Sequence, residues 1–320
     1  MDRRNFLLGA AATVGGLAAG SVSEAGSTLK IVFPYAPGGG GDVLARLIAD
    51  HLEKKMGIST IVENRTGADG RIGTRDVKQA EPDGKTLLFT PFGTMVLAPS
   101  VFKDLQYDPV ADFAPVTQAV TFDFGFATGP MTKTKTLAEL VAWLKKNPDQ
   151  GNVAVPGLGT LPHLLPLKFA EAANVKISAI SYKGTVPSLT AVMGGQVPMV
   201  CGPLGDLVAQ ARAGTINLLA TSGKKRHPQV AEVPTFIEQG YNISGSAWYA
   251  FYAPAKTPTA EIDKLHKEII EAIRSPAFQE RARSLWLNPT GTTPAELAAI
   301  QKEDFELWAP VIKAANLVPR

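Results

Sequence analysis

The sequence is poor in the residues that metal-dependent and nucleophilic enzymes use. It has one cysteine, Cys201, and four histidines that are far apart in the chain, His51, His163, His227 and His266. A single cysteine cannot form an internal disulfide bond. Neither a Gly-x-Ser-x-Gly nor a His-Glu-x-x-His pattern occurs. We therefore expect no metal, no cofactor and no enzymatic activity.

The sequence also lacks an excess of one sign of charge. The chain has 32 basic and 29 acidic side chains, for a net charge of +3, and the basic residues are scattered without an aromatic-rich basic stripe. This pattern argues against a nucleic-acid partner. With 320 residues, of which 45% are hydrophobic, the chain has ordinary globular composition and can form two domains with separate cores.

The first 25 residues read as an export signal that is removed. Arg3 and Arg4 precede an apolar stretch over residues 6–19, and Ser23-x-Ala25 resembles a signal-peptidase site. Fourteen apolar residues are too few to span roughly 30 Å of hydrocarbon. The Arg3-Arg4 pair is also similar to a twin-arginine signal, so both export routes stay open. No cysteine lies near the cleavage site, and we expect a freely diffusing mature protein outside the cytoplasm.

Apolar strand-like runs alternate with helical patterns along the mature chain. Leu44, Ile48, Leu52 and Met56 recur every fourth residue and predict a helix that covers a sheet. This alternation predicts an α/β fold with mostly parallel strands. The predicted strands are 29–33, 59–62, 86–89, 153–155, 177–181, 197–201 and 216–220.

Two extended aromatic runs suggest that the chain passes between two lobes. They are residues 122–126 and 248–252, each followed by a proline-containing turn. A double crossing makes the first lobe discontinuous. The predicted division is lobe 1 at residues 26–126 and 246–320, and lobe 2 at residues 127–245.

Glycine-rich turns are the most informative feature of the chain. Residues 34–42 and 64–73 each connect a strand-like run to a helix-like run, and the first contains four consecutive glycines. Without Cβ atoms, and at the start of a helix, main-chain amides can reach an anion directly. Two similar turns, 153–163 and 181–187, follow strands of lobe 2, and ligands of open α/β sheets bind where such turns lie. The four turns therefore predict a cleft that binds a carboxylate.

Three other functions remain possible from the residues. A dinucleotide fold is suggested by residues 38–41 after a strand and by Glu63 at the end of the next, although Leu44 occupies the third small position. A periplasmic hydrolase could use Asp42 and His163. A receptor that reports to a membrane sensor would look the same in sequence as one that feeds a permease.

The turn motifs resemble the Bug family, the periplasmic solute receptors of tripartite tricarboxylate transporters. The resemblance runs from about Lys30 to the C-terminus and rests on Pro34-x-x-Pro37-Gly38-Gly39-x-x-Asp42, Asn64-Arg65-x-Gly67-Ala68-x-Gly70, Pro82-Asp83-Gly84, Gly157-x-Gly159-Thr160-x-x-His163, Tyr182-Lys183-Gly184 and Pro234-Thr235. It implies a two-lobed periplasmic binding protein of the type II, Venus-flytrap class, with a cleft between the lobes. It also implies a small carboxylate ligand, either an organic acid or an amino acid, and a membrane permease as partner. We expect a monomer.

The resemblance implies ligand contacts position by position. The first two turns would hold the carboxylate, a third wall would flank it, and lobe 2 would face it. Asp42 also fits as a helix-start residue and His163 as a packing residue. The implied ligand-binding residues are Tyr35, Ala36, Pro37, Gly38, Gly39, Gly40, Gly41, Asp42, Gly67, Ala68, Asp69, Gly70, Thr90, Gly93, Thr94, Gly159, Thr160, His163, Tyr182 and Thr185.

The chain departs from the family pattern at Asp69, where a second glycine is expected, and at Lys85, where tyrosine is common. A carboxylate beside an anion site weakens binding unless it points away, is neutralised by Arg65 or Arg71, or meets an amine of the ligand. We therefore hypothesise that Asp69 favours a ligand with a positive group, such as an amino acid.

Overall fold

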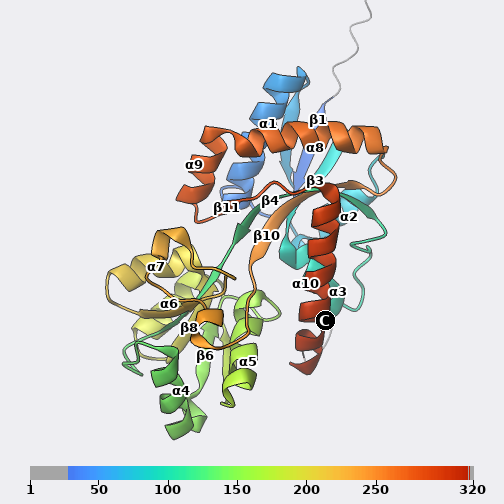
Figure 1. Cartoon of the computed structure of the whole chain (residues 1–320). Coiled ribbons are helices and arrows are strands. Elements are labelled where there is room, and N and C mark those ends of the chain that lie inside the picture. Colours follow the sequence, from blue (N-terminus) through green and yellow to red (C-terminus); the bar gives the residue numbers. More distant parts are fainter. Residues whose placement is uncertain (1–27, 316, 318–320) are drawn as a thin grey trace, which may run out of the picture.

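The computed structural model describes residues 28–315 and 317 of the 320-residue chain. The predicted export signal at residues 1–25 lies outside these residues. Two β-sheets with helices packed against them form two lobes, one above the other in Figure 1. The predicted α/β class and the two-lobed architecture are confirmed. Among the helices that the structure describes, none is long and apolar enough to cross a bilayer.

The upper lobe combines an early and a late part of the chain. Its sheet has the order β11-β4-β10-β3-β1-β2. The strands are β1 Leu29–Phe33, β2 Thr60–Asn64, β3 Thr86–Pro91, β4 Phe113–Phe122, β10 Ala247–Pro254 and β11 Asn288–Pro289. The helical segments are α1 Gly40–Met56, η1 Ala68–Gly70, α2 Arg71–Lys78, η2 Gly93–Leu97, α3 Ala98–Val101, α8 Thr259–Arg274, α9 Pro276–Ser284 and α10 Pro294–Ala314.

The lower lobe is built from the middle of the chain. Its sheet has the order β7-β6-β8-β5-β9. The strands are β5 Phe124–Thr128, β6 Asn152–Val155, β7 Ser178–Ser181, β8 Met199–Pro203 and β9 Asn217–Thr221. The helical segments are α4 Leu137–Lys146, η3 Pro148–Gln150, α5 Leu161–Ala173, α6 Thr185–Met193, α7 Leu204–Arg212, η4 Pro228–Val230 and η5 Ile237–Gln239.

The helix α1 shows how the predicted periodicity builds the core. Leu44, Ile48 and Leu52 have no exposed surface and belong to the apolar cluster beneath α1 and α8. The helix ends at Gly57, which adopts a left-handed conformation with φ 66° and donates its amide to Glu53 O. Burial of this stripe against the sheet stabilises the lobe that carries the first two glycine-rich turns.

The pairing of the strands differs from the prediction of mostly parallel sheets. Among the described strands, four pairs are parallel and five are antiparallel. The antiparallel pairs all involve β4, β5 or β10, which lie next to the connections between the lobes. A strand that enters a sheet from the other lobe runs against its neighbours, and the local apolar runs gave no sign of this direction.

Two connections join the sheets and are bonded to each other. The chain leaves the upper sheet at Asp123, between β4 and β5, and returns through residues 222–246. Ser222 Oγ accepts from the Phe124 amide at 2.9 Å and donates to Gly245 O at 2.7 Å. Ser246 Oγ donates to Asp123 Oδ1 at 2.5 Å. Residues 124–126 pair within the lower sheet, and the predicted lobe boundaries stay a proposal.

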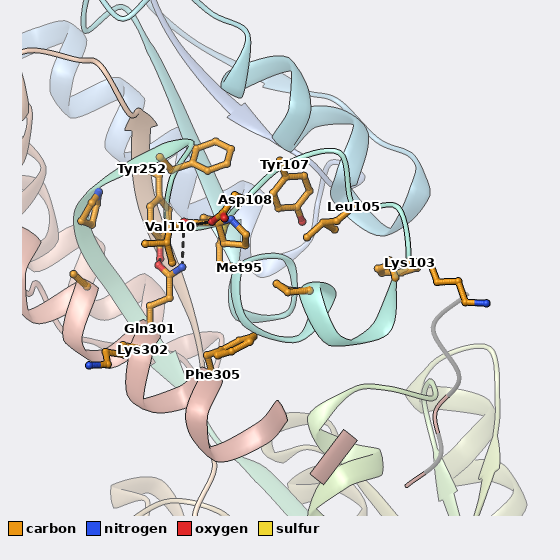
Figure 2. A pocket seen from close by; sticks show the side chains of 16 residues that line it. Met95, Lys103, Leu105, Tyr107, Asp108, Val110, Tyr252, Gln301, Lys302 and Phe305 are labelled. Carbon is orange, nitrogen blue, oxygen red and sulfur yellow. Dashed lines mark hydrogen bonds between the residues drawn. The ribbon is translucent and has the colours of Figure 1, made fainter. Parts of the chain in front are cut away.

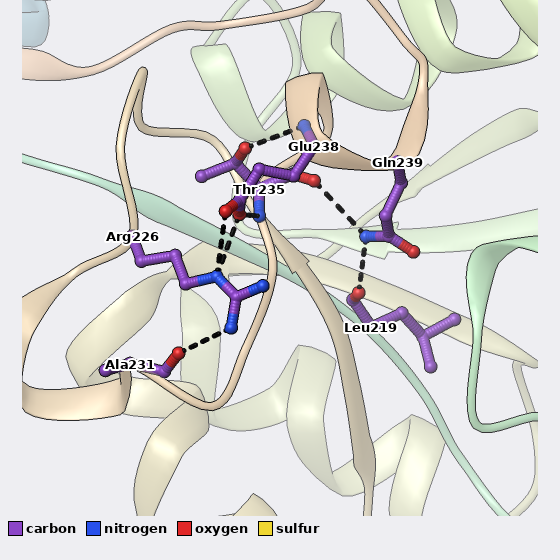
Figure 3. Close-up of polar contacts among 6 residues, drawn as sticks. All are labelled: Leu219, Arg226, Ala231, Thr235, Glu238 and Gln239. Carbon is purple, nitrogen blue, oxygen red and sulfur yellow. Dashed lines mark hydrogen bonds and ion pairs between the residues drawn. The ribbon is translucent and has the colours of Figure 1, made fainter.

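The returning connection is held by an ion pair on its own segment (Figure 3). Arg226 Nε lies 3.0 Å from both carboxylate oxygens of Glu238, and Arg226 Nη1 donates to Ala231 O at 2.8 Å. Glu238 also accepts from the Thr235 amide at 2.8 Å, and Thr235 Oγ1 accepts from the Glu238 amide at 3.1 Å. Arg226, which follows Lys224 and Lys225 in the sequence, therefore stabilises the fold of the returning connection.

A half-buried carboxylate, Asp304, ties the other end of this connection to α10. Trp248 Nε1 donates to Asp304 Oδ2 at 2.9 Å, and Trp248 is 1% exposed. Burial raises the pKa of Asp304 from 3.8 to about 6, although the Trp248 hydrogen bond opposes this shift. The ionised carboxylate is therefore less stable in the folded protein than in water.

We expect Asp304→Asn to stabilise the protein at neutral pH. Because the folded state holds the Asp304 proton more tightly, the unfolding free energy falls as the pH rises from 3.8 to about 6. Asparagine keeps an acceptor for Trp248 without the charge, so the variant should gain about 1 to 3 kcal/mol at pH 7 and nothing below pH 4. Urea unfolding at both pH values measures the gain. A gain that is equal at both, or one also seen for the exposed Glu306→Gln, contradicts this account.

Candidate ligand-binding cleft

A cavity of about 790 Å³ is lined by turns of both lobes. The upper lobe contributes Tyr35, Asp69, residues 91–93 and Tyr249, and the lower lobe contributes residues 156–162 and 181–183. Except for Tyr249, which lies in β10, these segments lie at or after the carboxyl ends of β1, β2, β3, β6 and β7. The cavity therefore lies where the turns were predicted to meet.

The first turn is held in shape by a buried carboxylate. Asp42 is 3% exposed and accepts four hydrogen bonds. They come from the Gly38 amide at 2.9 Å, from Arg46 Nε and Nη2 at 3.1 and 3.0 Å, and from Asn64 Nδ2 at 2.9 Å. Burial raises the pKa of Asp42, but these donors outweigh it and the net pKa lies below its usual value. Asp42 thus joins the turn, the helix α1 and the end of β2.

The amides at the start of α1 remain available for a ligand. Among the described residues, no acceptor is found for the amides of Gly39, Gly40 and Gly41. A Cβ at Gly41 would lie 2.8 Å from the ring of Tyr249, which lines the cavity. The start of the helix therefore lies behind this part of the cavity wall.

The second turn consists of four residues with positive φ. Gly67, Ala68, Asp69 and Gly70 have φ angles of 127°, 48°, 54° and 86°. This conformation favours glycine, and aspartate tolerates it better than most residues. The backbone thus explains why glycine is expected at position 69. A Cβ at Gly67 would come within 2.5 Å of Ile72, so Gly67→Val would strain the turn and is no clean probe of binding.

The Tyr35 hydroxyl connects the two turns. It donates to Asp69 O at 3.1 Å and lies 3.3 Å from Thr94 Oγ1. The Thr94 carbonyl accepts in turn from the hydroxyl of Tyr107 at 2.7 Å. Burial raises the pKa of Tyr35, so this phenol keeps its proton at neutral pH. These bonds hold the first turn, the second turn and the segment that contains Thr94 in place relative to one another.

In the lower lobe, a histidine holds the turn between β6 and α5. His163 is 6% exposed, and its Nδ1 accepts from the Gly159 amide at 3.1 Å. Burial lowers the pKa of His163 and favours the neutral ring that this bond requires. Thr160 is the cap residue of α5, but its hydroxyl donates to Gly157 O at 2.8 Å instead of accepting from the helix. The helix α6 is capped by Gly184 and begins at Thr185.

The predicted contacts divide into two groups. Six line the cavity: Tyr35, Asp69, Gly93, Gly159, Thr160 and Tyr182. Fourteen lie outside its lining: Ala36, Pro37, Gly38, Gly39, Gly40, Gly41, Asp42, Gly67, Ala68, Gly70, Thr90, Thr94, His163 and Thr185. Asp42 and His163 in the second group bond to the turns and support them. Ligand contact by any of the twenty stays a prediction.

The sequence reading missed the apolar side of the cavity. Phe92, Phe102, Phe122, Phe124 and Tyr249 all line it. Other rings of the same runs, Phe126, Trp248, Phe251 and Tyr252, are buried in the core. The extended runs at residues 122–126 and 248–252 carried the signal for the cleft, because a strand next to a crossing between lobes passes the cleft.

A second cavity of about 720 Å³ lies between α10 and the segment 102–115 (Figure 2). Its central polar groups are already paired: Tyr252 Oη donates to Gln301 Oε1 at 2.8 Å, and Gln301 Nε2 donates to Pro109 O at 3.2 Å. None of the predicted contacts lines this cavity. It is therefore not a candidate for the carboxylate site.

One group of side chains on α1 and α8 has metal-ligand spacing. The nearest ligand atoms of His51, Glu268 and Glu271 lie within 4.8 Å of one another in the part of the chain that the structure describes. Lys55 Nζ already pairs with Glu271. None of these residues lines the cleft, so the group has no role in the site.

Comparison with known proteins decides the family. The family model described as "Tripartite tricarboxylate transporter family receptor" matches residues 44–317. The chain belongs to this family. Since the tripartite tricarboxylate transporter receptors are solute-binding proteins, the chain is a binding protein and not an enzyme, and the resemblance to the Bug family is confirmed.

Relatives of this receptor family cover nearly the whole chain. The "UPF0065 protein in the TAR-I ttuE-ttuC' intergenic region" of Agrobacterium vitis is 32% identical over 91% of this chain and 85% of that protein. The periplasmic binding protein BugD is 31% identical with a TM-score of 0.73, over 92% of this chain and 99% of BugD. Rpa4515 of R. palustris, solved with adipate, is 28% identical with a TM-score of 0.77, over 92% and 98%.

We expect Asp42→Ala to loosen the first turn of this receptor. The change leaves the Gly38 amide, Arg46 and Asn64 without their acceptor, so the unfolding free energy at pH 7 should fall by about 2 to 4 kcal/mol. Because the folded pKa of Asp42 lies below 3.8, the difference from wild type is full above that pH and shrinks below it. Urea unfolding between pH 3 and pH 7 tests this. The exposed Asp50→Ala on the same helix is the control, and an equal loss there would refute the assigned role.

Proposed function

We propose that the protein is an exported receptor that captures a small carboxylate and delivers it to a membrane permease of the tripartite tricarboxylate type. The family membership and the cleft between two lobes support this role. A structural neighbour that holds adipate supports a carboxylate as ligand. The predicted signal at residues 1–25 supports a periplasmic location, and we propose a monomer without cofactor or metal.

The chemistry of the cleft favours main-chain recognition of the carboxylate. Lys183 is the only cationic side chain among the described residues that line the cavity. The amides of Gly39, Gly40 and Gly41 lie at the positive end of a 17-residue helix. Each hydrogen bond to a charged oxygen contributes about 1.5 to 3 kcal/mol. Four or five such donors give micromolar affinity after the ordering cost of the ligand.

Capture requires that the two lobes move relative to each other. The connections are short at Asp123 and longer at residues 222–246, so the lobes can close on a ligand while the sheets stay intact. A permease would recognise the closed form. A receptor for a membrane sensor would use the same closure, and uptake of labelled ligand by vesicles that contain the permease separates the two roles.

The Gly39→Val variant tests the amide cradle, by which we mean the main-chain amides of Gly39, Gly40 and Gly41 as the carboxylate site. Gly39 has φ −74°, and a Cβ there meets no atom within 4 Å, so the substitution fits the fold. The bulk should block approach to the amides and weaken carboxylate binding at least about tenfold, which corresponds to about 1.4 kcal/mol. Calorimetry with the carboxylate identified by mass spectrometry of the purified protein, or with adipate, measures the loss. Thermal unfolding is the control for the fold.

Unchanged carboxylate affinity in Gly39→Val, with an unchanged unfolding temperature, would reject the cradle. Turnover of the ligand by purified protein would reject the receptor role itself.

A further inference from the structure

We propose that the cleft selects a zwitterionic amino acid with an apolar, preferably aromatic, side chain, and that Asp69 receives its ammonium group. This inference rests on the proposed carboxylate receptor and specifies its ligand class. Three features carry it: an acidic side chain in the cleft without a partner, the main-chain amides of the two turns that Tyr35 joins, and the aromatic walls of the cleft.

Asp69 is held in the cleft by its backbone. It lines the cavity and is exposed, with φ 54° and ψ 41° in the second turn. Its carbonyl accepts from the Tyr35 hydroxyl at 3.1 Å. The backbone of Asp69 is thus held by the same bond that joins the first and second turns.

The neighbouring cations that could neutralise Asp69 are bound elsewhere. Arg65 Nε lies 3.0 Å from Glu63 Oε1 and 3.0 Å from Asp76 Oδ2. Arg71 Nε donates to Ala68 O at 2.9 Å, and its guanidinium carbon lies 3.9 Å from the centre of the Phe102 ring. In the described part of the chain, the Asp69 carboxylate has no hydrogen bond or ion pair. Neutralisation by Arg65 or Arg71, one of the three ways to tolerate an acid beside an anion site, is thereby removed.

An α-amino acid can use the main-chain amides and the Asp69 carboxylate at the same time. Its carboxylate and its ammonium group are attached to the same carbon, so their binding groups must be neighbours. The two turns are bonded to each other through the Tyr35 hydroxyl and Asp69 O, and we infer from this bond that the amides of the turns and the Asp69 carboxylate can reach one ligand. A ligand with a carboxylate alone would place two negative charges close together in a partly desolvated cleft.

The rest of the cavity suits an apolar side chain. Phe122 and Tyr249 stack with ring centres 5.6 Å apart, and Phe102 and Phe124 line the same cavity. The lower lobe adds Leu158, which is exposed, and Pro156. A flat aromatic ring gains most from such walls because it buries apolar surface against ring faces. Lys183 is the competing feature, since it would favour a second carboxylate.

The experiment compares L-phenylalanine with 3-phenylpropionate, which lacks only the ammonium group. Calorimetry with the mature protein should give a dissociation constant at least about tenfold lower for phenylalanine. In Asp69→Asn, which fits the left-handed conformation, this preference should fall to about one, through weaker binding of phenylalanine. L-Alanine should bind wild type at least about tenfold more weakly than L-phenylalanine. Asp104→Asn is the control outside the cleft.

The outcomes separate this inference from the function on which it rests. Tighter binding of 3-phenylpropionate, an unchanged preference in Asp69→Asn, or binding of adipate alone would overturn the inference and leave the carboxylate receptor standing. If neither these probes nor adipate nor any co-purified acid binds, the proposed function fails as well.

Discussion

The buried Asp42 carboxylate is the interaction on which the binding end of the upper lobe depends. It accepts from the Gly38 amide, from Arg46 and from Asn64, so that one side chain joins the first turn, the helix α1 and the end of β2. A carboxylate that is 3% exposed is stable only with such donors. Because its lone pairs are used for this purpose, the role of Asp42 is to hold the shape of the turn. In the proposed function, recognition of the ligand falls to the amides beyond it.

The lower lobe uses the same principle with a different side chain. His163 Nδ1 accepts from the Gly159 amide, as Asp42 accepts from the Gly38 amide. In both lobes a residue in the first turn of a helix reaches back to fix the glycine turn that precedes it. The two connections between the lobes are in turn fixed to each other by Ser222, Ser246 and Asp123. Turns that are held by hydrogen bonds on both lobes, with connections bonded to each other, suit the lobe closure that the proposed function requires.

Sequence reasoning identified the secondary structure better than the topology. The predicted strand at residues 29–33 is observed with the same bounds, and the predicted apolar spacing of Leu44, Ile48 and Leu52 forms the buried face of α1. These features depend on residues close together in sequence. The direction of β10 beside β3 and β4 depends instead on where a distant part of the chain re-enters the sheet. For this reason, the prediction of mostly parallel strands was wrong.

The sequence by itself determined the family, the α/β class and the glycine-rich turns, because four consecutive glycines and regular apolar spacing have the same physical meaning in any fold. Only the tertiary structure decided which residues share the cleft. It brought Phe102, Phe122 and Tyr249 beside Asp69 and occupied Arg65 and Arg71 elsewhere. Aromatic rings and charges that are far apart in sequence line the same cleft only when the two lobes pack together. No local sequence pattern specifies which of these residues meet.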